Sequence, residues 1–273
     1  MKYLRRRLSK SLLVAVFVVL TSGFQTIDTK TVAKNVTVYF PDGQTWHPSQ
    51  KVPIKASAQT FPVVFFLQGT GGGDRRAESW SRWFIQHGIG AVIISSAKMR
   101  GLENLLGYSP YILASDVQKA IEVVKHHPQI DLTRYAVMGF SRGGTAALRL
   151  TTHTLDDLII MPDFMFALYP AGSGGCGINF EDGIDVHIFY GELDDWGTYK
   201  DNRKNCKQLA SSHENATFHL LENTHHGYDD SVVFDFQENG LNFHSEPNAA
   251  AREQTELVIL GAIRTRWALT APQ

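Results

Sequence analysis

The chain has 273 residues, of which 43% are hydrophobic and 19% are charged, and its formal net charge is −1. A chain of this length and hydrophobicity can bury a large core, which excludes an intrinsically disordered protein. The near-neutral charge gives no electrostatic basis for binding nucleic acid, so no nucleic-acid partner is expected. We expect a signal peptide over residues 1–23 and one globular domain over residues 24–273.

The signal peptide is predicted from the order of residue types at the N-terminus. Lysines and arginines come first, an apolar stretch over residues 12–20 follows, and small or polar residues lead to Gly23. The apolar stretch is too short to span a bilayer of about 30 Å comfortably, so we expect cleavage near Gly23 and no stable membrane insertion afterwards. This predicts a secreted or periplasmic protein and leaves the general secretory and twin-arginine routes open.

Short apolar segments alternate with amphipathic ones along the rest of the chain. Strands are predicted over residues 35–40, 52–58, 61–67, 91–94, 135–138, 164–169, 186–190 and 217–222, and helices over residues 78–87, 111–127, 144–150, 200–210 and 249–267. Residues 68–73 are rich in glycine and are expected to form a loop. Strands that alternate with helices indicate an α/β fold, in which helices cover both faces of a mostly parallel sheet.

The two cysteines, Cys176 and Cys206, have only one possible pairing. Because an oxidising compartment favours disulfides, export of the protein predicts a bond between them. Closing a loop of about thirty residues would stabilise the fold by about 3–4 kcal/mol in the chain-entropy model. We therefore assign these cysteines a structural role.

Residues 139–143, Gly-Phe-Ser-Arg-Gly, match the G-x-S-x-G pattern of a nucleophile elbow. The serine of an elbow sits on a sharp turn between a strand and a helix, where bulky neighbours would clash with the backbone. An apolar segment precedes Ser141 and a helix-forming segment follows it, as the elbow requires. The alternative is a glycine-rich turn without chemistry.

Polar motifs follow two later predicted strands. Gly-Glu-Leu-Asp-Asp-Trp starts at Gly191, and Asn-Thr-His-His-Gly-Tyr starts at Asn223. In a parallel sheet, reactive groups gather at the carboxyl ends of the strands, and the order serine, acid, histidine is that of α/β-hydrolases. The histidine would take the proton of Ser141, a poor nucleophile by itself, and the acid would hold the imidazole in the required tautomer.

These three motifs resemble those of the dienelactone hydrolase branch of the α/β-hydrolases, particularly its exported members with a serine nucleophile, over residues 61–228. The resemblance implies the α/β-hydrolase fold. It selects Asp194, three residues after a glycine, with Asp195 as the second choice. It also selects His226, which directly precedes Gly-Tyr, over His225. Dienelactone hydrolases proper use a cysteine nucleophile, so their lactone substrate is not transferred to this chain.

The resemblance also implies the disulfide between Cys176 and Cys206. The oxyanion of the reaction needs hydrogen-bond donors already in place. We expect the backbone N–H groups of Arg142, which follows the nucleophile, and Thr70, in the glycine-rich loop, to form this oxyanion hole. Gly71 is the alternative donor in that loop.

The predicted function is hydrolysis of a small or oligomeric carboxylic ester through an acyl-serine intermediate, without a metal or an organic cofactor. Hydrolysis of peptides, acyl transfer, or a non-catalytic binding function on the same fold are the alternatives. Residues 225–230 contain two histidines and two aspartates, but they lack a recognised metal-ligand spacing. Residues 99–111, 172–183 and 234–244 are expected to be loops that shape the pocket, and the sequence does not determine their conformations.

Overall fold

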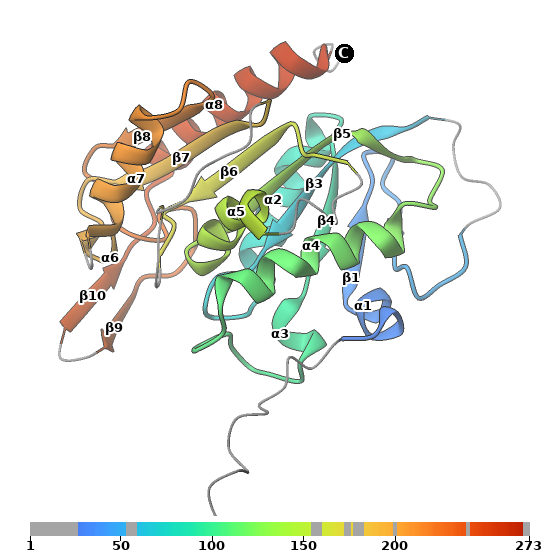
Figure 1. Cartoon of the computed structure of the whole chain (residues 1–273), viewed down its shortest axis with the longest axis horizontal. Helices are drawn as coiled ribbons and strands as arrows, with labels where there is room; N and C mark the ends of the chain where they lie inside the picture. Colours follow the sequence, from blue (N-terminus) through green and yellow to red (C-terminus); the bar gives the residue numbers. More distant parts are fainter. Residues whose placement is uncertain are drawn as a thin grey trace, which may run out of the picture.

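The protein is described by a computed structural model, shown in Figure 1, which covers residues 27–52, 59–153, 160–171, 176, 183–198, 201–238 and 241–269. The predicted signal peptide lies outside the described residues, and so does nearly all of the strand predicted over residues 52–58. None of the helices in the described ranges is both long enough and apolar enough to cross a membrane.

The centre of the molecule is an eight-stranded sheet in the order β2-β1-β4-β3-β5-β6-β7-β8. Strands β3 to β8 pair in parallel, whereas β1 is antiparallel to both β2 and β4. The prediction of an α/β fold with a mostly parallel sheet is therefore confirmed. The strands are β1 (Val36–Tyr39), β2 (Thr45–Trp46), β3 (Phe61–Leu67), β4 (Gly90–Ile94), β5 (Ile130–Phe140), β6 (Phe164–Leu168), β7 (Asp185–Gly191) and β8 (Ala216–Leu221).

Helices cover both faces of this sheet. The described helices are α1 (Thr29–Lys34), α2 (Arg75–Gln86), α3 (Ser96–Met99), α4 (Pro110–Val124), α5 (Arg142–His153), α6 (Asp195–Thr198), α7 (Asn202–Ser211) and α8 (Ala249–Trp267). In Figure 1, α4 and α5 cross in front of the sheet and α2 lies behind it. The Arg252 guanidinium of α8 lies 3.4 Å from the centre of the Trp80 ring of α2, so these two helices pack together.

Strand β3 is apolar along its whole length. All seven of its residues are buried, because helices cover the sheet on both sides. Pro62 has no N–H to donate, and the register between β3 and β5 shifts between Pro62 and Val63. Strand β5, which leads to the predicted elbow, pairs with β3 in the middle of the sheet.

Residues 234–244, which were expected to be a loop, instead contain a two-stranded antiparallel hairpin. Strand β9 (Phe234–Glu238) pairs with β10 (Leu241–Ser245), with Phe236 opposite Phe243. The hairpin lies apart from the main sheet, near α6 (Figure 1). The Asp195 carboxylate accepts a hydrogen bond from the backbone N–H of His244 at 2.9 Å and so fixes the hairpin to α6.

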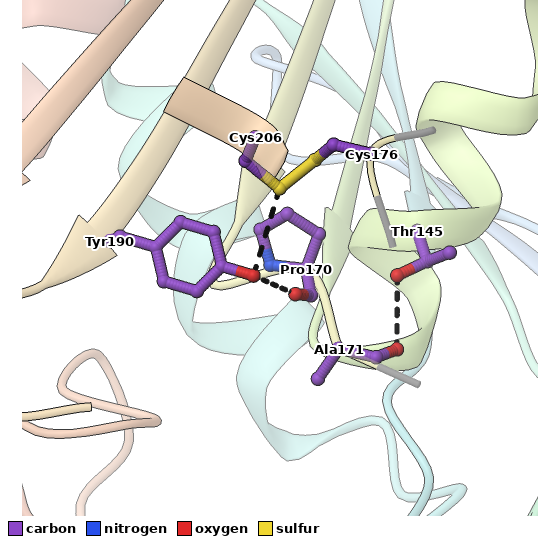
Figure 2. The surroundings of a disulfide bond; sticks show 6 residues. All are labelled: Thr145, Pro170, Ala171, Cys176, Tyr190 and Cys206. Carbon is purple, nitrogen blue, oxygen red and sulfur yellow. Dashed lines mark hydrogen bonds between the residues drawn. A yellow bond between two sulfur atoms is a disulfide. The ribbon is translucent and has the colours of Figure 1, made fainter. Parts of the chain in front are cut away.

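The predicted disulfide between Cys176 and Cys206 is present, and it joins the segment after β6 to α7 (Figure 2). The Cα atoms of the two cysteines are 4.7 Å apart. The Tyr190 hydroxyl at the end of β7 lies 3.8 Å from the Cys206 sulfur and donates a hydrogen bond to the carbonyl of Pro170. The cross-link therefore stabilises the carboxyl ends of β6 and β7.

Two stacked histidines link β7 and β8. The Nδ1 atom of His187 lies 3.0 Å from Nε2 of His219, and their rings are nearly parallel. Burial lowers the pKa of both imidazoles, and the neighbouring His187 lowers that of His219 further, to about 4. Between pH 6.5 and 4 the unfolded chain, with ordinary histidines, therefore binds more protons than the folded chain, so acid favours unfolding.

The free energy of unfolding of the wild type should decrease as the pH falls from 6.5 to 4. We expect this decrease to be smaller in His219→Phe by about 1–3 kcal/mol. Phenylalanine keeps an aromatic ring against Phe189, whose centroid lies 4.6 Å from that of His219, but it cannot take up a proton. Melting temperatures across this pH range, followed by circular dichroism, measure the effect. His87→Phe, at a half-buried histidine, is the control, and equal pH slopes for wild type and His219→Phe would refute the assignment.

Candidate active site

Ser141 occupies a sharp turn between β5 and α5. Its backbone φ is 52°, a left-handed conformation that is strained for serine. A Cβ added to Gly139 would lie 2.0 Å from the carbonyl oxygen of Gly143, and one added to Gly143 would lie 2.3 Å from that of Leu67. Only glycine fits these two positions, which explains the G-x-S-x-G spacing. The backbone N–H of Ser141 donates to the carbonyl of Leu168 at 3.0 Å and ties the turn to β6.

Asp194 and His226 form a buried pair beside this turn. Asp194 follows β7, His226 follows β8, and Nδ1 of His226 lies 2.9 Å from Oδ2 of Asp194. A carboxylate only accepts hydrogen bonds, so Nδ1 carries the proton and Nε2 presents its lone pair. Within the described part of the chain, this Nε2 atom is buried without a hydrogen-bond partner. His226 and Ser141 line the same cleft, so Nε2 can accept a proton from a group bound there.

The second-choice residues of these two motifs lie elsewhere. Asp195 holds the hairpin through His244, as described above. The His225 ring packs edge-on against that of His244, with a centroid distance of 4.6 Å. Neither Asp195 nor His225 is among the described residues that line the cleft. The carboxylate at hydrogen-bond distance from Nδ1 of His226 is that of Asp194, whereas Asp195 bonds to the hairpin.

The two residues predicted to supply the oxyanion hole are in direct contact. Nε of Arg142 donates to Oγ1 of Thr70 at 3.1 Å, and Nη1 donates to the carbonyl of Tyr108 at 2.6 Å. Both residues line the cleft, as does the alternative donor Gly71. The Arg142 side chain thus fastens the glycine-rich loop to the elbow.

A buried glutamine sets the shape of the glycine-rich loop from below. Nε2 of Gln68 donates to the carbonyl of Gly72 at 2.7 Å, and its Oε1 accepts from the backbone N–H of Ala97 at 3.1 Å. Gln68 also donates to the Asp74 carboxylate. These bonds hold the loop in one conformation, which favours preorganised backbone donors at its edge.

Arg76 is a charged residue of the cleft that the sequence did not indicate. Its Nη2 lies 2.7 Å from Oδ2 of Asp230, and its Nε lies 3.5 Å from Oδ1 of Asp229. Burial alone would lower the pKa of this guanidinium, but the neighbouring acidic groups keep it above its usual value. Arg76 therefore stays charged. About 150 residues of sequence separate it from Asp229 and Asp230.

Two aromatic rings hold the His226 imidazole. The ring centroids of Trp196 and Tyr169 lie 4.2 Å and 4.6 Å from that of His226, and both rings meet it edge-on. The Tyr169 hydroxyl donates to Asp229, which also accepts from the Trp80 indole at 2.7 Å. Burial raises the pKa of Tyr169, so the hydroxyl remains a donor. This packing restricts rotation of His226 away from Asp194.

The cleft has a volume of about 1020 Å³, large enough for a drug-sized molecule. Its walls come from the segments that follow the parallel strands β3 to β8, together with the hairpin. The described lining residues are Gly69, Thr70, Gly71, Gly72, Gly73, Arg75, Arg76, Asn104, Leu106, Gly107, Tyr108, Ser109, Ser141, Arg142, Ala171, Trp196, Asn202, His226, Asp230, Phe234 and Phe236.

The strand order, the strained elbow and the cleft at the carboxyl ends of the strands define an α/β-hydrolase fold, as the motif resemblance implied. Solved structures share it. A provisionally assigned dienelactone hydrolase from Klebsiella pneumoniae is 15% identical, with a TM-score of 0.55 over 78% of this chain and 90% of its own. MGS-M1, an α/β hydrolase from a Medee basin deep-sea metagenome library, is 21% identical, with a TM-score of 0.52 over 84% of this chain and 92% of its own.

A third similar structure is that of Thermogutta terrifontis esterase 2 phosphonylated by cyclosarin. It is 14% identical, with a TM-score of 0.54 over 87% of this chain and 91% of its own. No protein-family model and no curated protein matched the sequence. Identities this low show a shared fold, and the chemistry must be argued from the residues of the site.

Proposed function

We propose that this protein is a serine hydrolase that cleaves carboxylic esters through an acyl-serine intermediate. The observation that carries the proposal is the buried pair of Asp194 and His226 in the same cleft as Ser141, whose strained turn needs the two flanking glycines. A strained backbone at a polar residue is typical of a functional site. The esterases and hydrolases with the same fold support this reaction class.

In the proposed reaction, Oγ of Ser141 attacks the ester carbonyl carbon while Nε2 of His226 takes the hydroxyl proton. Asp194 stabilises the imidazolium that forms. The backbone N–H groups of Arg142 and Thr70, with Gly71 as the alternative to Thr70, would stabilise the oxyanion. Collapse of the tetrahedral intermediate expels the alcohol, which takes the proton from His226. Water then attacks the acyl-serine by the same route and releases the carboxylic acid.

We further propose that the protein acts outside the cytoplasm, after removal of residues 1–23. The disulfide between Cys176 and Cys206 supports this location, because reducing compartments keep most thiols unpaired. The substrate in this proposal is a soluble small or oligomeric ester that reaches the cleft from solution.

Covalent labelling tests the proposed nucleophile. We expect a fluorophosphonate to add one adduct to the folded protein, because the probe reacts with a serine whose proton a neighbouring base can accept. Intact mass spectrometry measures the adduct, and peptide mapping should locate it at Ser141. Heat-unfolded protein is the control and should not react. A folded protein that stays unlabelled would contradict the proposal and favour a non-catalytic binding function.

A further inference from the structure

Two histidines and a glutamate form a cluster where the hairpin meets the loop that carries His226. His225 directly precedes His226, His244 lies on β10, and Glu246 follows that strand. One potential ligand atom from each of the three residues lies within 4.8 Å of the other two. We propose that His225, His244 and Glu246 bind a divalent transition-metal ion with the ligand preferences of zinc.

His244 has the hydrogen-bonding pattern of a metal ligand. Its Nδ1 lies 2.8 Å from Oδ1 of Asp235, and its Nε2 lies 3.3 Å from Oε2 of Glu246. When Nδ1 donates to Asp235, a neutral His244 points the Nε2 lone pair at the Glu246 carboxylate, which is repulsive. A cation between the two atoms turns this repulsion into coordination. Metal-bound histidines commonly donate their second ring nitrogen to a carboxylate, as His244 does to Asp235.

The spacing between the ligand atoms of His244 and Glu246 fits a zinc coordination sphere. Bonds of about 2.0–2.1 Å in a tetrahedral site place neighbouring ligand atoms about 3.3–3.4 Å apart. The separation of 3.3 Å between His244 Nε2 and Glu246 Oε2 therefore fits two ligands of one ion. Protonation of His244 would relieve the same contact without a metal, and the titration below separates these two explanations.

His225 supplies the third ligand. Its Nδ1 atom is buried and has no hydrogen-bond partner within the described ranges. A buried polar atom without a partner is destabilising, and coordination to a metal would remove this cost. The His225 ring meets that of His244 edge-on at 82°, with centroids 4.6 Å apart, and a ligand atom of each lies within 4.8 Å of the other.

The ligand set selects the class of metal. Two imidazoles and one carboxylate suit Zn²⁺, whereas Mg²⁺ and Ca²⁺ prefer oxygen ligands alone. The side chains of His244 and Glu246 are 33% and 52% exposed, so a water molecule can take the fourth position. Bound zinc would cross-link the hairpin, whose Phe234 and Phe236 line the cleft, to the loop that carries His226.

Calorimetric titration of Zn²⁺ into the untagged, chelator-treated protein tests this site. We expect one ion per chain. At a free zinc concentration one hundred times the Kd, the melting temperature should rise by about 5–10 °C for a chain of this size. Co²⁺ in the same site should give the visible absorption of tetrahedral nitrogen and oxygen coordination. Mg²⁺ should give neither binding heat nor a shift.

Matched variants locate the site. His244→Ala and Glu246→Gln should each abolish or strongly weaken zinc binding, while His87→Ala, at another half-buried histidine, should bind like the wild type. Circular dichroism checks that each variant is folded. Because Glu246 is exposed, Glu246→Gln still tests the site if His244→Ala does not fold correctly. Absence of zinc binding, equal binding by Glu246→Gln, or a comparable response to Mg²⁺ would overturn the proposal.

Discussion

Ser141→Ala is expected to lower kcat for a short-chain ester by about 10⁴- to 10⁶-fold, because the variant has no hydroxyl to form the proposed acyl intermediate. The histidine, the acid and the proposed oxyanion donors remain, but the hydroxyl that they would activate is gone. Initial rates with a chromogenic ester, at protein concentrations high enough to detect slow turnover, measure the loss. The KM of any residual activity should stay close to that of the wild type.

The control for this variant is Ser81→Ala, which removes a buried serine hydroxyl outside the cleft. The Ser81 hydroxyl bonds to the carbonyl of Ala77 within α2, so its loss should leave the rate within a few-fold of wild type. Alanine at position 141 must adopt the same left-handed backbone as Ser141, so the melting temperature is measured alongside the rate. A folded Ser141→Ala protein with wild-type turnover would eliminate this serine as the nucleophile.

Asp194→Asn is expected to reduce kcat by about 10⁴-fold with a much smaller change in KM. Asparagine fits the space but can donate its amide hydrogen to Nδ1 of His226, which stabilises the wrong tautomer. Nε2 then carries the proton and cannot accept the one from Ser141. Steady-state kinetics that separate kcat from KM measure the effect.

Asp195→Asn is the matched control, since it makes the same chemical change one residue away. Asparagine can still accept the hydrogen bond from the His244 backbone, so we expect activity within about threefold of wild type. The same substitution is thus expected to lower the activity strongly at position 194 and hardly at all at position 195. Similar losses in both variants, or a larger loss for Asp195→Asn, would show that the wrong aspartate was assigned.

The elbow and the central sheet were predictable because their causes are local. The glycines around Ser141 are required by contacts within the turn and with β3, and a strand buried on both faces is apolar along its length. The carboxyl ends of parallel strands lie at one edge, so motifs after β7 and β8 were expected to meet. Their order along the chain pointed to the three motifs, and the resemblance to the dienelactone hydrolase branch selected Asp194 and His226 within two of them.

Other features depended on contacts between distant parts of the chain. Residues 234–244, which include Phe234, Phe236 and Phe243, were expected to be a loop. A lone two-stranded hairpin is marginal in water and needs support from outside. That support comes from Asp195, about fifty residues earlier. The pairing of Arg76 with Asp229 and Asp230 had no sequence signal for the same reason.

The disulfide has a consequence for proteolytic damage. Asp194 lies inside the covalent ring closed by Cys176 and Cys206, Ser141 precedes the ring, and His226 follows it. A single cut anywhere between the two cysteines opens the ring but leaves both fragments joined through sulfur. The segments that carry the serine and the histidine therefore stay in one molecule after such a cut. In surroundings rich in proteases, this arrangement keeps a nicked chain from losing half of its cleft by dissociation.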